Sequence, residues 1–87
     1  MRFQGIATLV RENRLKTGVS QSELSAALGY KNGQFISNVE RGLCSVPLKQ
    51  LPLICKTLNI KPDDAILEIT ADFRKHAVEV FNASAQL

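Results

Sequence analysis

The side chains in this sequence best suited to specific chemistry are two amides, Gln34 and Asn38, within the stretch GYKNGQFISNVERG. They stand four positions apart, so a helix would place them on the same face. Ile36 and Val39 fall on another side of that helix, at the spacing of a buried face. A planar amide carries a donor and an acceptor, so it can bond N6 and N7 of adenine at once. The stretch therefore predicts a short helix over residues 33–41 that presents amides to base edges.

Two further residues are candidates for base reading at the front of this helix. Phe35 is at the border of the two faces, where it could join the core or lie against a thymine methyl group. We favour the position at the edge of the groove. Asn32 is a good N-cap residue for the helix and completes the base-reading set.

Side chains able to reach phosphate groups flank the same helix. They either carry a positive charge or can donate a hydrogen bond, which are the properties that contacts to a nucleic-acid backbone require. These candidates are Ser20, Gln21, Lys31, Ser37, Arg41 and Lys49.

The elements that must position these side chains are all predicted to be helices. Apolar residues recur at spacings of three and four along the chain, and alternation typical of strands is scarce. The first helix is expected from Phe3 to Lys16, and Gly18 is expected to end it. Its inward side chains are expected to be Ile6, Leu9, Val10 and Leu15.

The second helix has the clearest start signal in the sequence. Ser20 can cap the first backbone amides while Glu23, three positions later, returns a hydrogen bond to the cap residue. Gly29 is expected to end this helix. Its inner face is expected to consist of Leu24, Ala27 and Leu28.

Two more helices are expected after Gly42. The fourth should begin near Leu48, because Pro52 is tolerated only in a first turn, and should bury Leu51, Ile54, Cys55 and Leu58. The fifth should begin at Pro62 and run to about residue 82, as one helix or as two with a break near 70–72, with residues 83–87 frayed. Its apolar stripe, which could fold back on the domain or pair with a second copy, is Ile66, Ile69, Phe73, Ala77, Val80 and Phe81.

The order SQSELSAALGY, ISNVERG and VPLKQLPLICKTLNI resembles the phage repressor/Cro family of helix-turn-helix proteins, the XRE-like group, over residues 6–66. The resemblance implies an all-α, five-helix DNA-binding domain at residues 1–69 whose second and third helices read DNA. Residues 70–87 would form a helical extension for dimerisation or partner contact.

The resemblance also implies roles for particular residues. Gln21 would touch a phosphate and buttress a base-reading side chain, and Arg14 and Glu40 would form a structural pair between the first and third helices. Six residues separate Gly29 from Ile36, one more than is common in the family. Either the turn is longer by one residue or the third helix gains an extra half-turn, and this decides which of residues 32–35 reach the bases.

Charge is distributed unevenly along the 87 residues. Residues 1–61 contain nine basic and three acidic residues, a balance of +6, whereas residues 62–87 contain two basic and five acidic residues, a balance of −3. The basic part predicts a polyanionic partner. No catalytic set is recognisable, so we expect no enzyme and no cofactor.

Three reactive residues have simpler interpretations than a site. Cys44 and Cys55 are expected to be free thiols rather than a disulfide or redox switch, with Cys55 in the core and Cys44 in a loop. His76 stands alone, without the partners that a metal or a proton-transfer site would need.

The expectation from the sequence is a cytoplasmic, nucleoid-associated regulator of transcription. It would bind double-stranded DNA as a homodimer, act as a repressor on a palindromic operator, and make no membrane contact. The alternative is an antitoxin or adaptor whose C-terminal helix holds a protein partner.

Overall fold

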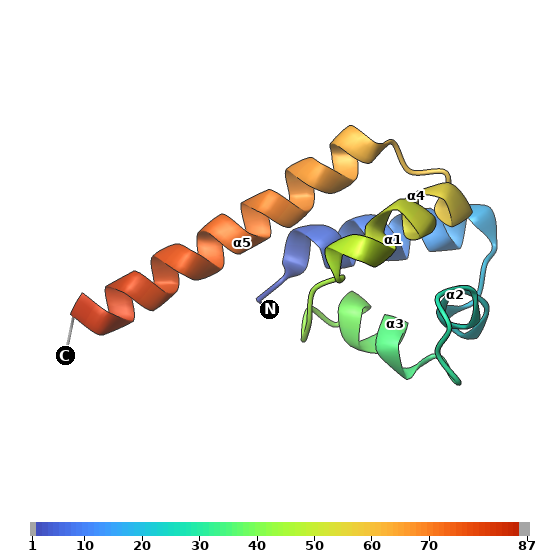
Figure 1. Ribbon diagram of the computed structural model, residues 1–87, viewed down its shortest axis with the longest axis horizontal. Helices are drawn as coiled ribbons and strands as arrows, with labels where there is room; N and C mark the ends of the chain where they lie inside the picture. Colours follow the sequence, from blue (N-terminus) through green and yellow to red (C-terminus); the bar gives the residue numbers. More distant parts are fainter. Residues whose placement is uncertain (1, 86–87) are drawn as a thin grey trace.

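The computed structural model describes residues 2–85, and every regular element within this range is helical (Figure 1). Five α-helices and one short 3₁₀ helix confirm the all-α class for the described residues. The elements are α1 (Gln4–Thr17), α2 (Gln21–Ala27), α3 (Gln34–Glu40), the 3₁₀ helix η1 (Leu48–Gln50), α4 (Leu51–Leu58) and α5 (Pro62–Ala85).

A single apolar cluster holds the helices together. Helix α1 is central to it, because it contacts α3, α4 and α5. The cluster excludes water from its middle, where the hydrophobic effect contributes most per side chain. The largest apolar side chains with almost no exposure are Ile6, Val10, Leu24, Ile36, Val39, Ile54 and Leu58.

Local signals set the boundaries of the first two helices as expected. Gly18 ends α1 with a left-handed φ of 74°, a conformation that costs glycine little. The backbone N–H of Glu23 donates to Ser20 Oγ at 2.9 Å, and the N–H of Ser20 donates to Glu23 Oε1 at 3.2 Å. The predicted capping box is confirmed, so the seven-residue helix α2 begins at a well-defined point.

The expected buried stripe of the fourth helix is also confirmed. Its α-helical part begins at Leu51, three residues later than expected, because Leu48–Gln50 form a 3₁₀ turn first. Pro52 therefore lies at the beginning of α4, where its missing N–H disrupts no helical hydrogen bond. The buried side chains are Leu51, Ile54, Cys55 and Leu58.

Two side chains expected to be inward are exposed. Leu15 is 61% exposed because it lies five positions after Val10, which is about 140° further around the helix. Ala27 is also exposed, and the buried neighbour of Leu24 is instead Ser25. The side of α2 that faces the body is thus centred on residues 24 and 25.

Helix α5 is a single helix that continues beyond the body (Figure 1). It has no break at residues 70–72, and residues 83–85 are still helical, while 86 and 87 lie outside the described residues. Neither α5 nor any other described helix combines the length and the apolar character needed to cross a membrane.

Most of the apolar stripe of α5 does not fold back onto the body. Ile69 is buried and Ala77 is half-buried. Of the two alternatives for this stripe, burial against the chain's own domain is wrong for the other members, which face away from the body. The exposed members are Ile66, Phe73, Val80 and Phe81.

Asp72 of α5 contacts the beginning of α1, and no local sequence pattern indicates this contact. Its carboxylate accepts hydrogen bonds from the backbone N–H groups of Gly5 and Ile6, both at 2.9 Å. Glycine permits the approach, because a Cβ at residue 5 would lie 2.7 Å from Asp72 Oδ1. Asp72 thus caps the positive end of α1 from another helix. The expected boundary between residues 69 and 70 falls inside α5, before this contact.

Candidate nucleic-acid interface

Helices α2 and α3 are joined by a turn that absorbs the additional residue. Helix α2 ends at Ala27 and α3 begins at Gln34, so residues 28–33 form the connection. Gly29 has a φ of 90° within it. Of the two expected alternatives, the longer turn is present, and α3 has no extra half-turn.

Gly33 packs against the start of α2 and does not join the outer face of α3. A Cβ at this position would lie 3.2 Å from both the backbone nitrogen and the Oγ of Ser22. The turn therefore approaches α2 more closely than most side chains would allow. The first side chain that α3 can present outward belongs to Gln34.

Phe35 is half-buried and forms part of the wall of the turn. Its ring stacks on Tyr30, with the centroids 4.3 Å apart and the planes inclined by 16°. The Tyr30 hydroxyl in turn donates to Gln50 Oε1 at 3.2 Å. Phe35 thus contacts both the core and the turn, which is the border position expected from its place in the sequence.

The two amides of α3 are hydrogen-bonded to each other. Gln34 Nε2 donates to Asn38 Oδ1 at 2.8 Å. The expectation of Asn32 as the N-cap is wrong, because Gly33 is the N-cap of α3, and Asn32 Oδ1 instead accepts from the backbone N–H of Gln34 at 2.9 Å from one position earlier. Gln34 and Asn32 are exposed and Asn38 is half-exposed. A surface of three amides therefore lies at the front of α3.

A charged network fixes α3 against α1 and α2. Arg14 Nε and Nη2 donate to the two carboxylate oxygens of Glu40 at 2.6 and 3.0 Å, and Arg14 Nη1 donates to the carbonyl of Val19 at 3.1 Å. Gln21 Nε2 also donates to Glu40 Oε1, at 3.2 Å. The hydrogen bond to Glu40 raises the pKa of Arg14 above its ordinary value. This is the pair between the first and third helices that the resemblance implies.

A small polar hollow lies beside this network, where α1, α2 and α3 meet. It has a volume of about 270 Å³, and Gln21, Ser37 and Arg41 line it together with Arg11. Arg11 was not among the residues expected to contact phosphates. Its position one helical turn before Arg14 was the available signal, because residues three apart share a face.

The remaining phosphate candidates do not line this hollow. The Ser20 hydroxyl accepts the capping hydrogen bond at the start of α2. Lys31 in the turn and Lys49 in η1 are exposed, and no ion pair is formed by either lysine within the described residues. The residues brought around one hollow are therefore Gln21, Ser37 and Arg41.

The thiols and the histidine do not form a metal site. Cys44 is half-buried and Cys55 is buried, both are free, and burial raises the pKa of each thiol. The ring of His76 lies edge-on to Phe3 at 6.0 Å, and its Nδ1 has no hydrogen-bond partner. Within residues 2–85, no three His, Cys, Asp or Glu side chains are grouped as metal ligands would be.

Comparison with known proteins identifies no relative of this chain. The chain matches no family model, no curated protein and no solved structure.

Proposed function

We propose that this protein is a sequence-specific DNA-binding regulator of transcription whose α3 enters the major groove. The observation that carries the proposal is the two-sided character of α3. Ile36 and Val39 anchor one side in the core, while Gln34 and Asn38 form an amide pair on the other. A helix after a turn, anchored in this manner, is how helix-turn-helix proteins present side chains to base edges.

The amide pair is suited to an adenine. The bond between Gln34 and Asn38 uses one Gln34 hydrogen and one Asn38 lone pair. Both hydrogens of Asn38 Nδ2 and the carbonyl of Gln34 remain for a base. Adenine offers an acceptor at N7 and a donor at N6 in the major groove, which matches this set.

The basic residues beside α3 supply the affinity that does not depend on sequence. Arg11 and Arg41 lie at the same hollow, and Gln21 and Ser37 add hydrogen-bond donors there. Glu40 also lines the hollow, but its charge is paired with Arg14. Phosphates held at this place would fix the register of α3 in the groove. Bound protein would then block polymerase or recruit it.

Selection from a random pool of DNA duplexes tests the proposal directly. The purified full chain is mixed with the pool at several salt concentrations, and bound duplexes are sequenced. We expect enrichment of one motif, with affinity that falls as salt rises. Binding without enrichment of any sequence would contradict specific recognition, and no binding at low salt would contradict a DNA partner altogether.

A second candidate function is a protein-binding module of the antitoxin or adaptor type. The observation that favours it is the exposure of Phe73 and Phe81 on α5, at 70% and 77%. Co-purification from the native cell tests it, with Phe81→Gln as the matched variant. A stoichiometric heterologous partner that the variant loses would support this function. If no such partner is found and one DNA motif is enriched, the regulatory function is supported instead.

A further inference from the structure

One side of α5 carries five large apolar side chains that the rest of the chain leaves largely uncovered. Ile66 and Val80 are each 51% exposed, Leu67 is 65% exposed, and Phe73 and Phe81 are more exposed still. Here these five residues are called the exposed α5 face. Such a contiguous apolar surface on a small protein marks a site of association.

The two ends of the exposed α5 face are symmetric about its middle. The pair Ile66–Leu67 and the pair Val80–Phe81 lie at opposite ends, and Phe73 lies beside the midpoint, which falls between residues 73 and 74. Steps of seven residues drift by only about 20° around a helix, so Ile66, Phe73 and Val80 form one straight stripe, and Leu67 and Phe81 lie along the same edge of it. Turning α5 end over end exchanges Ile66 with Phe81, Leu67 with Val80 and Thr70 with Ala77, and it sets Phe73 opposite Arg74 of the other copy. An interface between two identical copies related by a two-fold axis requires this self-complementarity.

The charges along α5 favour an antiparallel arrangement over a parallel one. Residues 62–73 contain four acidic residues and no basic residue, whereas residues 74–85 contain two basic residues and one acidic residue. Parallel pairing would set the acidic halves beside each other. Antiparallel pairing sets each acidic half beside the more basic half of the other copy and also opposes the helix dipoles.

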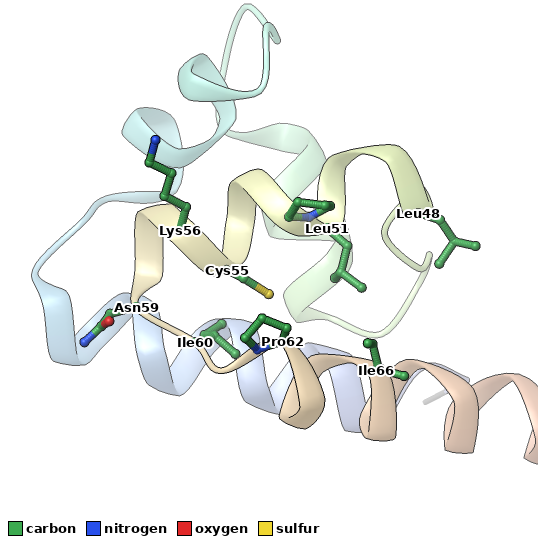
Figure 2. Close-up of a pocket in the computed structure, with 9 residues that line it drawn as sticks. Leu48, Leu51, Cys55, Lys56, Asn59, Ile60, Pro62 and Ile66 are labelled. Carbon is green, nitrogen blue, oxygen red and sulfur yellow. The ribbon is translucent and has the colours of Figure 1, made fainter.

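The body offers a groove at the end of the stripe. Figure 2 shows Ile66 beside a groove between α4 and α5, with Leu48 and Leu51 among the side chains around it. The groove has a volume of about 750 Å³, and Leu48 is 72% exposed. In an antiparallel pair, Phe81 of the second copy lies opposite Ile66. Its ring therefore has an apolar groove to enter.

We propose that two copies of this chain pair antiparallel through the exposed α5 face, with Phe81 of each copy packed against Ile66 and Leu48 of the other. A stable interface buries about 800 Å² per partner. A fully buried aromatic side chain contributes roughly 150–250 Å², so two phenylalanines and the aliphatic residues of the face approach this area. The biological role of this pairing rests on the proposed function, because a dimer would read two half-sites. The pairing itself can be measured without DNA.

The mass of the full chain in solution tests the pairing. By analytical ultracentrifugation at about 50 μM we expect twice 9.6 kDa for the native chain. Phe73→Gln and Phe81→Gln should each weaken the dimer roughly ten-fold or more, since each substitution acts twice in a symmetric interface. Leu15→Gln, on an exposed leucine of α1, is the matched control and should leave the dimer intact. A monomeric native chain, or a dimer insensitive to both phenylalanine variants, would overturn the proposal.

Disulfide formation between separately marked copies tests the orientation. A Thr70→Cys chain is mixed with an Ala77→Cys chain and oxidised, and the joined peptides are identified by mass spectrometry. The antiparallel pair brings 70 and 77 together but leaves the two residues 70 about 10 Å apart along the axis, beyond disulfide reach. We expect the mixed 70–77 product. Efficient joining of 70 to 70 would overturn the antiparallel arrangement. If the dimer forms but DNA selection enriches no sequence, the proposed regulatory function is contradicted and the proposed antiparallel pairing is not.

Discussion

At the scale of single residues, Asn38 is the side chain on which specificity should depend most. It lies one turn beyond Gln34 and accepts the 2.8 Å hydrogen bond that orients the pair. Asn38→Ala should cost about 1–3 kcal/mol of binding free energy and relax the preference at one base pair. Binding titrations against the selected site and its single-base variants measure both effects.

Lys31→Ala is the matched control for Asn38→Ala. Lys31 is an exposed charge in the turn, so its loss should weaken binding to all sequences alike. If Asn38→Ala also weakened binding uniformly, Asn38 would touch only phosphate.

Residue types could be predicted to face inward or outward only where the periodicity is unambiguous. Ile36 and Val39 follow the helical repeat and are buried as expected. Leu15 is apolar yet exposed, and Ser25 is polar yet fully buried. Helical spacing accounts for Leu15, which lies off the buried side of α1, whereas the path of the neighbouring helices decides the burial of Ser25 and nothing in the local sequence encodes that path.

At the scale of elements, Glu40 determines how α3 is held. Its carboxylate accepts hydrogen bonds from Arg14 and Gln21, and the Glu40 side chain is only 5% exposed. Glu40→Gln should lower the free energy of unfolding by about 3 kcal/mol, because the Arg14 charge would lose its buried partner. Urea denaturation followed by circular dichroism measures the change.

The neighbouring exposed arginine provides the control for Glu40→Gln. Arg41→Gln alters the charge at the next position without touching the network, so we expect a change below about 0.5 kcal/mol. Equal effects of the two substitutions would mean that net charge, and not the bridge to α1, governs stability here.

Asp72 should stabilise the junction of α1 and α5. Asp72→Ala removes the acceptor for two backbone N–H groups and should cost about 1–3 kcal/mol of unfolding free energy. Thermal and urea unfolding measure it. Glu79→Ala, which removes an exposed carboxylate from the same helix, should be nearly neutral, and a cost equal to that of Asp72→Ala would contradict the capping role.

The sequence predicted helix limits well where a local motif defines them. The capping box at Ser20 and the stop at Gly18 depend on residues within a few positions, so their geometry follows from the residue types. The cap from Asp72 to Gly5 joins residues 67 positions apart. Helical spacing shows where Asp72 lies on α5 but not that the start of α1 lies beside it.

At the scale of the whole molecule, the positive body should govern the salt dependence of DNA binding. Arg11 adds a charge from α1 to the hollow that α2 and α3 share. Arg11→Ala should reduce the slope of log affinity against log salt by about 1 while leaving the preferred sequence unchanged. Titrations between about 50 and 200 mM salt measure the slope. An unchanged slope would contradict a contact between Arg11 and a phosphate.

The contact between Asp72 and α1 also has a consequence for the order of folding. During synthesis the first turn of α1 emerges early, yet its amides at residues 5 and 6 have no carboxylate partner until residue 72 has been added. Closing so long a loop is slower than forming a local helical turn. The nascent body is therefore expected to complete its native packing only after the middle of α5 has been translated.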